Sequence, residues 1–456
     1  MNTPEFDIVI AGAGLSGLST AHFLKKQAPE AKILILEKTE RPGGAIRSMK
    51  EQGFLAEWGA HGFLDNVEES RELLNDLGLT EHVLKAPLKQ FKRYICKNGK
   101  LAQIPQSPPT IIKSKLLSFP EKLKVLADLW KKPKSGEQTI AQWASYRFGR
   151  AILPFADIAL TGTYAGDIET LSIDAAMPGI RDLEKKYGSV FRGAIKSRKN
   201  KTSAGMPSMV SFEDGMEFLL KKLASGKVIR YESAIEQIKK TEEGWELEVN
   251  GELIQTKQIV LALPINSALK ILNGLQKPPQ SAVREAVVNN VVLGFDNTAD
   301  IPFGFGYLAP KIEKRFALGT LFSIHMFPKR APEGFNLIEI LVGGTRNPEH
   351  LSLDDEEMIK RAIKDVSKLI KLPAKPVFSQ VLRPASGIPQ LEIGHLQFLE
   401  YREQLQKKFE GLHICGFGWQ AIGINDMIKQ AKTVANAAFK GKSADQESPR
   451  AKPVYF

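Results

Sequence analysis

Residues 6–37 read FDIVIAGAGLSGLSTAHFLKKQAPEAKILILE, and the order of apolar, glycine and polar residues in this stretch decides the fold. The apolar run 6–11 predicts a buried strand, and the run 32–37 predicts a second one. Between them, a glycine turn is followed by a helix over Leu18–Lys26. Because the helix leads from the end of one strand to the start of the next, the two strands must run parallel. The stretch therefore predicts a β-α-β unit that opens an α/β domain.

The turn, Gly12-Ala13-Gly14-Leu15-Ser16-Gly17, fits the dinucleotide-binding pattern G-x-G-x-x-G. Gly12 permits the tight turn, Gly14 lets the backbone approach a pyrophosphate, and Gly17 lets helix and strand pack closely. The helix N-terminus offers free N–H groups and a positive dipole end to the phosphates. Glu37 ends the second strand and is placed to accept hydrogen bonds from a ribose hydroxyl. A glycine turn without a ligand is the alternative, but the strand, helix and acidic residue are all present.

A second glycine pair follows in Arg41-Pro42-Gly43-Gly44. Its spacing after Glu37 resembles that of the flavin amine oxidase-like superfamily. The resemblance implies FAD as the cofactor, with Arg41 and the backbone of the glycine pair along the phosphates and ribityl chain. A loop that uses glycine only for turning is the alternative.

Near the C-terminus, the strand 412–415 ends in Gly416, and Gly423-Ile424-Asn425 opens a helix that we expect to end near Phe439. Such a helix N-terminus, aimed at the flavin C2=O and N1, would stabilise the reduced ring. An ordinary helix cap by Asn425 is the alternative. A weaker resemblance places Ile235 against the adenine. The FAD contacts that the resemblance implies are Gly12, Gly14, Leu15, Ser16, Gly17, Glu37, Lys38, Arg41, Gly43, Gly44, Ile235, Gly416, Gly423, Ile424 and Asn425.

Composition excludes several classes of protein. The chain has 456 residues, of which 43% are hydrophobic and 25% charged, as in ordinary globular domains. Its two cysteines, Cys96 and Cys415, exclude a disulfide framework and indicate a reducing compartment. No basic leader precedes Ile8–Leu18, and no window reaches the roughly 18 apolar residues of a spanning helix. We therefore expect a cytoplasmic protein.

The pattern along the chain predicts a composite α/β (α+β) architecture, namely a Rossmann-like FAD-binding domain, a mixed-sheet substrate domain and a helical insertion. The insertion is expected to include the helices Ile112–Phe119 and Glu121–Trp130, and Ser352 is expected to cap a helix that ends at Leu369. The predicted segments are FAD-binding at 1–90, 206–285 and 384–440, substrate-binding at 91–112 and 286–383, helical at 113–205, and a mobile tail at 441–456.

Four further stretches resemble protoporphyrinogen oxidases, the flavoenzymes of haem synthesis, and the similarity runs nearly end to end. They are GTYAGD at 162–167 followed by Leu171-Ser172, Glu184 to Ser189, FPKRAP at 327–332, and Val342-Gly343-Gly344. The resemblance implies that FAD carries the chemistry, as hydride transfers from a porphyrinogen to flavin N5, and that O2 is the acceptor.

The resemblance also implies substrate contacts. Arg93 matches an arginine that pairs with a propionate, which suits the guanidinium fork. Gly162 matches a glycine at the reacting edge of the macrocycle, and helix termination is its alternative role. His61 matches a variable polar position near the site. The apolar residues that match ring contacts are Leu308, Leu321 and Leu341, although relatives carry Phe in place of Leu341, and core packing is their alternative role.

Several alternatives stay open. The resemblance implies protoporphyrinogen IX as the substrate, and coproporphyrinogen III, which has two more propionates, is the alternative. A flavin oxidase for an amine would carry an aromatic residue after Gly423, where this chain has Ile424. A flavin-bearing binding protein without turnover is a further alternative. The pattern indicates no metal site, and Asp354 to Glu357 are interpreted as an acidic first helical turn.

The net charge of +12 is unevenly distributed. Residues 113–134 carry seven Lys and two acids, and residues 181–201 carry eight Lys or Arg and two acids. Both stretches lie in the helical insertion, and apolar residues beside them, such as Phe119, Leu126 and Trp130, are typical of an interfacial helix. An anionic membrane surface on the inner face of the cytoplasmic membrane is therefore a candidate partner, and a solvated basic face is the alternative. Ferrochelatase or another haem-pathway enzyme is a second candidate, nucleic acid is not expected, and the chain is a monomer or a homodimer.

Overall fold

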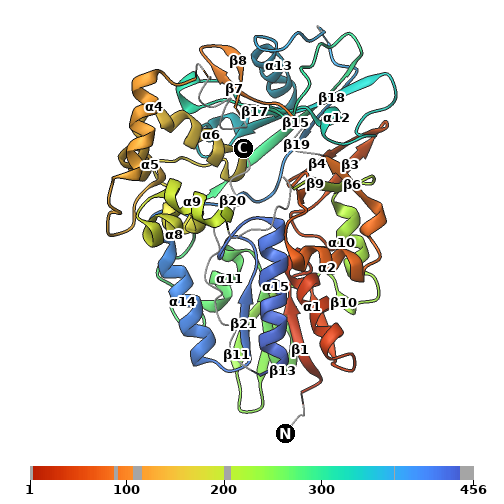
Figure 1. Ribbon diagram of the computed structural model, residues 1–456. Helices are drawn as coiled ribbons and strands as arrows, with labels where there is room; N and C mark the ends of the chain where they lie inside the picture. Colours follow the sequence, from red (N-terminus) through yellow and green to blue (C-terminus); the bar gives the residue numbers. More distant parts are fainter. Residues whose placement is uncertain are drawn as a thin grey trace.

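The computed structural model describes residues 4–86, 91–105, 114, 116–199, 207–373 and 375–441. The elements form a lower α/β body, an upper sheet and a helical region beside it (Figure 1). The prediction of a Rossmann-like domain with a mixed-sheet domain and a helical insertion is confirmed. The exact boundaries of the predicted segments stay predictions, and the predicted tail lies outside the described residues except for Gly441.

The lower sheet has the order β10-β2-β1-β13-β12-β11, and β21 also pairs with β13. β1 pairs in parallel with both β2 and β13, so the predicted β-α-β unit is confirmed. The intervening helix α1 starts at Leu15, inside the glycine motif and earlier than predicted. The strands of this sheet are β1 (Phe6–Ala11), β2 (Ile33–Leu36), β10 (Ile229–Arg230), β11 (Ile235–Lys240), β12 (Trp245–Val249), β13 (Glu252–Ala262) and β21 (Leu412–Cys415).

Helices cover both faces of this sheet, which explains why β1 is an uninterrupted apolar run. Ile10 packs into the cluster below α1 and α15, whereas its neighbour Val9 packs into the cluster on the opposite face. The helices of the first face are α1 (Leu15–Gln27), α2 (Glu68–Asp76), α10 (Glu217–Ala224) and α15 (Ile424–Phe439). Those of the second face are α11 (Ile265–Leu272) and α14 (His395–Lys408).

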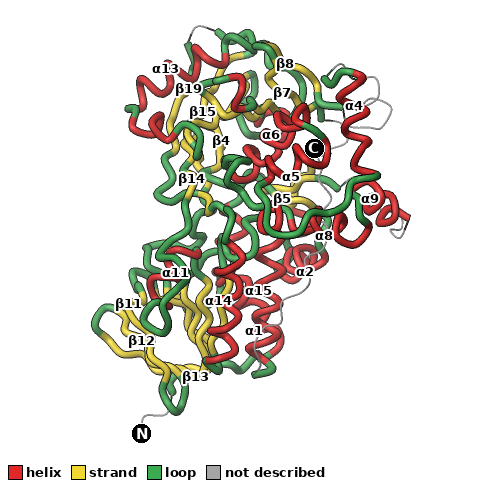
Figure 2. Tube along the Cα trace, turned by 90° about the vertical axis from the view of Figure 1, so that its left-hand side faces the viewer, coloured by secondary structure: helices red, strands yellow, loops and turns green. Residues whose placement is uncertain are grey.

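The upper sheet has the order β19-β15-β18-β17-β16-β7-β8, and only the β16–β7 pair is parallel. Figure 2 shows β7, β8, β15 and β19 of this sheet above the lower body. Helix α13 (Asp355–Val366) covers one face through Met358, Ala362 and Val366. The predicted Ser352 cap is wrong: Asp354 caps this helix by accepting a hydrogen bond from the Glu357 N–H at 2.8 Å. The strands are β7 (Arg93–Lys97), β8 (Lys100–Gln103), β15 (Val288–Asp296), β16 (Gly306–Leu308), β17 (Ala317–Leu321), β18 (Phe335–Gly343) and β19 (Phe378–Leu382).

The helical region is held together by a buried ion cluster. Arg147 is fully buried and forms ion pairs with Asp128 at 3.0 Å and Glu184 at 2.5 Å. Trp143 donates a hydrogen bond to Glu184, and Arg181 forms an ion pair with the same carboxylate. Arg181 therefore belongs to the interior and adds no surface charge. The elements of the region are α4 (Phe119–Leu126), η2 (Ala127–Leu129), α5 (Ile140–Phe148), η3 (Arg150–Ile152), α6 (Leu153–Tyr164), α7 (Ile173–Ala176), α8 (Pro178–Tyr187) and α9 (Val190–Lys199).

The predicted helix Ile112–Phe119 is wrong where the structure describes it, because residues 116–118 form a turn and α4 begins only at Phe119. Ser118 and Glu121 close a capping box there, and this local signal starts the helix. The rest of that prediction lies outside the described residues.

The remaining elements are short. They are β3 (Ser48–Glu51), β4 (Phe54–Glu57), β5 (Phe63–Leu64), η1 (Thr80–His82), β6 (Val83–Ala86), β9 (Met209–Phe212), β14 (Glu285–Ala286), η4 (Lys311–Glu313), α12 (Ser323–Met326), η5 (Pro348–Ser352) and β20 (Ile388–Pro389). Among the helices of the described residues, none is long and apolar enough to cross a membrane.

Candidate active site

The first glycine motif forms a loop with no room for side chains. Gly12 has a φ of +97°, and any Cβ at Gly17 would overlap the Gly12 carbonyl oxygen. Gly14 is the N-cap residue of α1 and provides no side-chain cap. The N–H groups of the first helical turn are therefore open to a ligand, as the motif predicts.

The second glycine pair lies directly against the first. The Gly43 N–H donates to the Ala13 carbonyl at 2.8 Å, and Gly14 and Gly43 form a parallel bridge. A Cβ at Gly44 would lie 3.4 Å from the Gly14 Cα, so the two loops face each other through bare backbone. Arg41 folds back and donates to the Gly44 carbonyl at 2.8 Å, which shapes this loop.

Glu37 is buried beside the first motif. Its Oε2 accepts from the Ala13 N–H at 2.8 Å, and its Oε1 accepts from the Thr39 N–H at 3.0 Å. The Thr39 hydroxyl also donates to Oε1, at 2.8 Å, so it is Oε2 that keeps a lone pair able to accept from a hydroxyl. The Ser233 N–H donates to the Glu37 carbonyl, which brings the strand that begins at Ile235 to this corner. The neighbouring Lys38 is exposed.

The N-terminus of α15 also lacks a side-chain cap, because Gly423 is its N-cap residue. Asn425, the alternative cap, instead accepts from Ser70 Oγ at 2.6 Å and donates to the Leu64 carbonyl at 2.9 Å. The cap interpretation is therefore wrong, and the first-turn N–H groups stay available. Ile424 is buried in the cluster around α1, and a Cβ at Gly416 would overlap the Leu263 carbonyl. Packing alone explains these two residues.

One face of the upper sheet brings the predicted substrate residues together. Leu308 pairs with Gly319, and Gly319 pairs with Leu341, so the two leucines lie in one row across β16, β17 and β18. Arg93 pairs with Gly306, and Gly306 pairs with Leu321, which forms the adjacent row. Directly paired residues share a face of a sheet. Leu308, Leu321 and Leu341 are partly exposed, although both neighbours of each along the strand are buried.

Gly162 lies opposite this face, within α6. A Cβ at this position would lie 2.9 Å from Leu308 Cδ1, so only a glycine leaves the gap between helix and sheet open. The alternative role in helix termination is wrong, because α6 continues to Tyr164 and ends at Ala165 in the left-handed conformation.

The guanidinium of Arg93 has a hydrogen-bond donor without a partner among the described residues. Its buried Nη1 has no hydrogen-bond partner among the described residues, and its guanidinium carbon lies 5.9 Å from the Phe305 ring centre. Burial lowers the pKa of Arg93, so an anionic partner would relieve an unfavourable charge. Arg93 is therefore placed to bind an anionic group.

His61 belongs to a buried polar network that the sequence did not reveal. Its Nε2 lies 2.8 Å from Glu339 Oε2, to which Asn290 also donates at 2.5 Å, and Ser323 donates to Glu339 Oε1 at 2.5 Å. Burial alone would lower the pKa of His61, but the Glu339 carboxylate outweighs it and the pKa is raised. Burial would likewise raise the pKa of Glu339, but the His61 charge and the hydrogen bonds lower it to about 2. Both shifts favour the charged forms, so each group stabilises the charge of the other.

Glu339 occupies the same row as Leu321 on β18, so this ion pair borders the apolar face. A second buried carboxylate, Glu57, accepts from Arg330 at 2.7 Å, and Asn290 donates to the Glu57 carbonyl. Two features of the sequence could have indicated buried charges here. They are the single Glu in the apolar run 337–342 and the Arg within 327–332.

The sequence profile of the family described as flavin containing amine oxidoreductase matches residues 15–438. The chain belongs to this family. It is therefore a flavoprotein oxidoreductase, and FAD is its cofactor. The two uncapped helix N-termini and the bare backbone between Gly14 and Gly44 fit that cofactor, with Glu37 at the corner expected for a ribose.

The curated relatives of this family member are similar over nearly their whole length. The coproporphyrinogen III oxidase of Staphylococcus aureus is 26% identical over 94% of this chain and 98% of its own. Protoporphyrinogen oxidase 2 of Arabidopsis thaliana is 27% identical over 90% of this chain and 89% of its own.

Solved structures show the same fold. An Exiguobacterium sp. 255-15 protein, named provisionally as a protoporphyrinogen oxidase, has a TM-score of 0.80 at 21% identity over 97% of this chain and 100% of its own. Reduced UDP-galactopyranose mutase has a TM-score of 0.72 at 15% identity over 95% and 96% of the two chains. Because enzymes with different names share this amine oxidoreductase fold, the fold alone does not identify the substrate.

Replacing Gly17 by Ala should abolish FAD binding, because the added methyl group collides with the Gly12 carbonyl and forces α1 away from the loop. The ratio of flavin absorbance near 450 nm to protein absorbance is expected to fall about tenfold or more. Gly274→Ala is the control, since the nearest atom to its Cβ would lie 3.4 Å away. Full FAD content in the Gly17 variant would contradict this account of the loop.

His61→Gln should lower the free energy of unfolding by about 3 kcal/mol, because it leaves the Glu339 carboxylate buried without its cation. The double variant with Glu339→Gln should recover part of this loss. The stabilisation by Glu339 is complete above pH 4.5 and is lost as the pH falls toward its lowered pKa of about 2. The stabilisation by His61 has the opposite dependence: it is complete below pH 6.5 and is lost as the pH rises through its raised pKa.

Denaturant unfolding of wild type and both variants at several pH values measures these differences. The difference between wild type and the single variant should be largest between pH 4.5 and 6.5. A difference that does not change with pH would contradict the ion pair.

Proposed function

We propose that this flavoprotein oxidises a porphyrinogen to the corresponding porphyrin, with dioxygen as the final acceptor and in the service of haem synthesis. The observation that carries the proposal is the face formed by Leu308, Leu321 and Leu341, with Arg93 at its edge, whose Nη1 has no hydrogen-bond partner in the described part of the chain. A flat apolar ring that carries carboxylate tails complements such a face. The names of the curated relatives support the same class of substrate.

The residues of the chain would act by binding and orientation. Arg93 would pair with one propionate, and the leucines would exclude water from the ring. Gly162 would let the ring edge approach the backbone of α6, because no side chain fills that gap. The His61–Glu339 pair would hold a fixed imidazolium beside the row of Arg93 and Leu321. FAD, when bound, supplies the electron acceptor for three successive two-electron oxidations that end as three molecules of H2O2.

Within this class we propose protoporphyrinogen IX as the substrate and keep coproporphyrinogen III as the alternative. In the two rows of strand-paired residues that contain Leu308, Leu321 and Leu341, Arg93 is the one cation that has no acidic partner among the described residues. Coproporphyrinogen carries two more propionates and would call for additional cations. The relatives bear both names, so they do not discriminate between the two substrates.

The test offers each porphyrinogen to the FAD-loaded protein. Porphyrin fluorescence should rise in air, and the flavin absorbance should bleach without oxygen. Neither change with either porphyrinogen would refute the proposal. Bleaching by an amine would instead favour an amine oxidase, and no bleaching by either class of substrate would favour a binding protein without turnover.

Arg93→Met should lower kcat/KM for the preferred porphyrinogen about tenfold to a hundredfold, because a charge-assisted hydrogen bond to a carboxylate is lost. The FAD content should not change. Arg71→Met is the control, since Arg71 is 60% exposed and pairs with Asp65. Unchanged kinetics in the Arg93 variant would show that this arginine does not bind the substrate.

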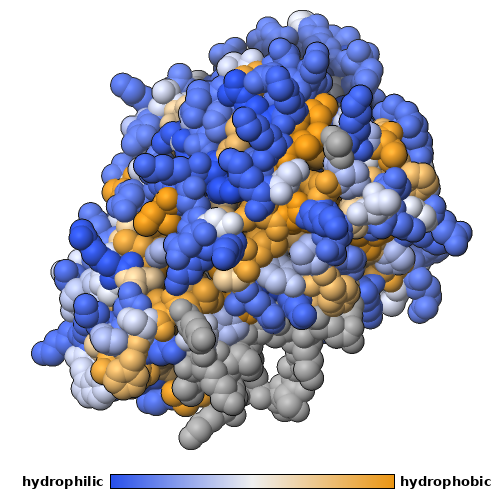
Figure 3. Space-filling model, turned by 90° about the horizontal axis from the view of Figure 1, so that it is seen from above, coloured by the Kyte–Doolittle hydropathy of each residue, from blue (hydrophilic) through white to orange (hydrophobic). Residues whose placement is uncertain are grey.

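We also propose that α4 and η2 contact an anionic membrane surface. Phe119 is 73% exposed, Trp130 76%, and Leu123 and Leu126 about half, so four large apolar side chains point outward from one short stretch. Seen from above, apolar side chains gather in a band across this end of the molecule (Figure 3). Lys124, Lys132 and Lys134 lie exposed in the same stretch. A haem-pathway partner such as ferrochelatase stays a prediction, and the oligomeric state stays open.

Neutralising Lys124, Lys132 and Lys134 with Gln should weaken binding to vesicles that contain anionic lipid, by about fivefold per lysine at low salt. Lys122 and Lys131 are poor choices, because they donate to the carbonyls of Ser114 and Tyr146 and so support the fold. Vesicle co-sedimentation measures the effect. Lys221→Gln, Lys257→Gln and Lys329→Gln serve as the charge-matched control on other surfaces, and equal binding by both triple variants would refute the proposal.

A further inference from the structure

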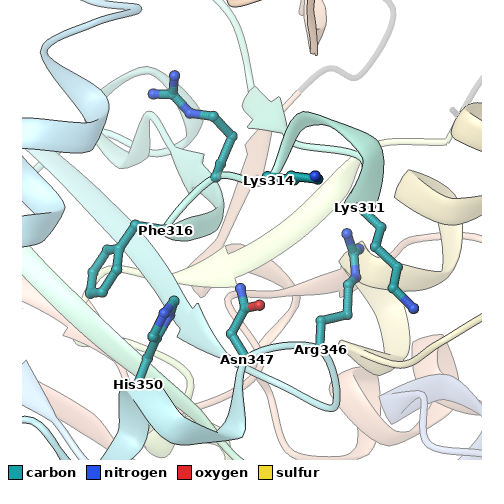
Figure 4. Close-up of a pocket in the computed structure, with 7 residues that line it drawn as sticks. Lys311, Lys314, Phe316, Arg346, Asn347 and His350 are labelled. Carbon is teal, nitrogen blue, oxygen red and sulfur yellow. The ribbon is translucent and has the colours of Figure 1, made fainter.

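A pocket of about 460 Å³ opens at the end of the upper sheet (Figure 4). It lies between η4, the start of β17 and the loop that follows β18. It is lined by Lys311, Lys314, Arg315, Phe316, Arg346, Asn347 and His350. The lining contains four cationic side chains and no carboxylate.

The pocket belongs to the α13 side of the sheet. Phe316 packs against the cluster that contains Ala309 and Val342, below α13. Leu308 and Leu341 precede these two residues along their strands, and successive side chains point to opposite faces. The pocket is therefore separate from the face proposed for the porphyrinogen, and its argument does not depend on that function.

Arg346 provides the main observation. Its side chain is only 4% exposed, and its Nη1 is engaged with the Ala309 carbonyl at 3.2 Å and with Asp157 at 3.3 Å. Its Nε and Nη2 are buried and have no hydrogen-bond partner in the described part of the chain. These two nitrogens form the side-on edge of the guanidinium, which offers two parallel N–H donors to two oxygens of an oxyanion. Burial lowers the pKa of Arg346, and a bound anion would offset that cost.

Of the other three cationic side chains in the pocket, two pair with carboxylates, and Lys314 remains for a ligand. Lys311 pairs with Asp167 at 2.6 Å, and Arg315 pairs with Asp365 at 3.2 Å. Lys314 is exposed and forms no ion pair with a described residue, and its φ of 49° fixes the backbone in the left-handed conformation. Figure 4 shows the Lys314 amine, the Arg346 guanidinium and the Asn347 amide around the same space.

The remaining wall is aromatic. Phe316 and His350 stack with ring centres 4.5 Å apart and planes at 30°. His350 Nδ1 is buried and has no hydrogen-bond partner among the described residues. The wall therefore combines a rigid apolar surface with one more polar atom.

We propose that this pocket binds a phosphate group, carried by inorganic phosphate or by a small phosphate monoester. A carboxylate is planar and would use the Arg346 edge alone, whereas a tetrahedral phosphate can also reach donors on other sides, such as Lys314 and Asn347. The volume leaves room for an organic part against the Phe316–His350 wall.

The test uses the FAD-loaded protein and inorganic phosphate at constant ionic strength, with isothermal titration calorimetry as the readout. One saturable site is expected. Lys314→Gln should weaken phosphate binding about threefold to tenfold, and Arg346→Lys about tenfold or more, since lysine keeps the charge next to Asp157 but loses the two-donor edge. Lys360→Gln is the control, because Lys360 is 75% exposed on α13 and outside the pocket.

No saturable binding of either free phosphate or the phosphate-bearing vesicles, wild-type affinity in both the Lys314 and the Arg346 variants, or an equal loss in the Lys360 control would overturn the proposal. A parallel titration with vesicles that contain phosphatidic acid identifies the source of the phosphate. Binding to these vesicles that both pocket variants weaken, without binding of free phosphate, would assign the group to a lipid headgroup. Calorimetry does not depend on porphyrinogen turnover, so failure of this proposal and failure of the proposed function are distinguishable.

Discussion

Two buried carboxylates, Glu57 and Glu339, hold the lower body and the upper sheet of this protein together. Each is about 1% exposed, and each has a cation, Arg330 or His61, within 2.8 Å. A buried charge is tolerated only with such a partner and with further hydrogen bonds. Asn290 bridges the two groups, since it donates both to the Glu57 carbonyl and to the Glu339 carboxylate. Because these contacts join β4, β15 and β18, the orientation of the face with Leu308, Leu321 and Leu341 relative to the glycine loops depends on them.

The cofactor cradle has a different physical basis, which is the absence of side chains. The loops at Gly14 and Gly44 approach each other as bare backbone, and the two helix ends at Gly14 and Gly423 have no side-chain cap. Uncapped N–H groups are unsatisfied until a ligand accepts from them. The backbone N–H donors of the site are therefore concentrated where phosphate and flavin oxygens are expected.

The sequence predicted much of this cradle, because glycine spacing and strand periodicity are local signals. Through resemblance it also grouped Arg93, Leu308, Leu321 and Leu341 as substrate contacts, a role that stays a prediction, and the strand register explains why such distant residues share one face. It did not predict the role of Glu339 or the partner of His61, since a buried ion pair between residues so far apart leaves no local pattern. The cap of α13 was also missed, at Asp354 rather than Ser352, because neighbouring polar residues fit a cap equally well.

The cradle is assembled from segments that lie at opposite ends of the chain. Gly14 is made early on the ribosome and Gly423 late, and the helical region with its own ion cluster is made between them. An emerging chain cannot hold the cofactor between both helix ends until β21 and α15 have left the exit tunnel. Until then the apolar surface of α1 that packs against α15 stays uncovered. Binding of a cofactor between both helix ends would thus come late in biogenesis, and until then the unfinished chain would expose apolar surface that is prone to aggregation.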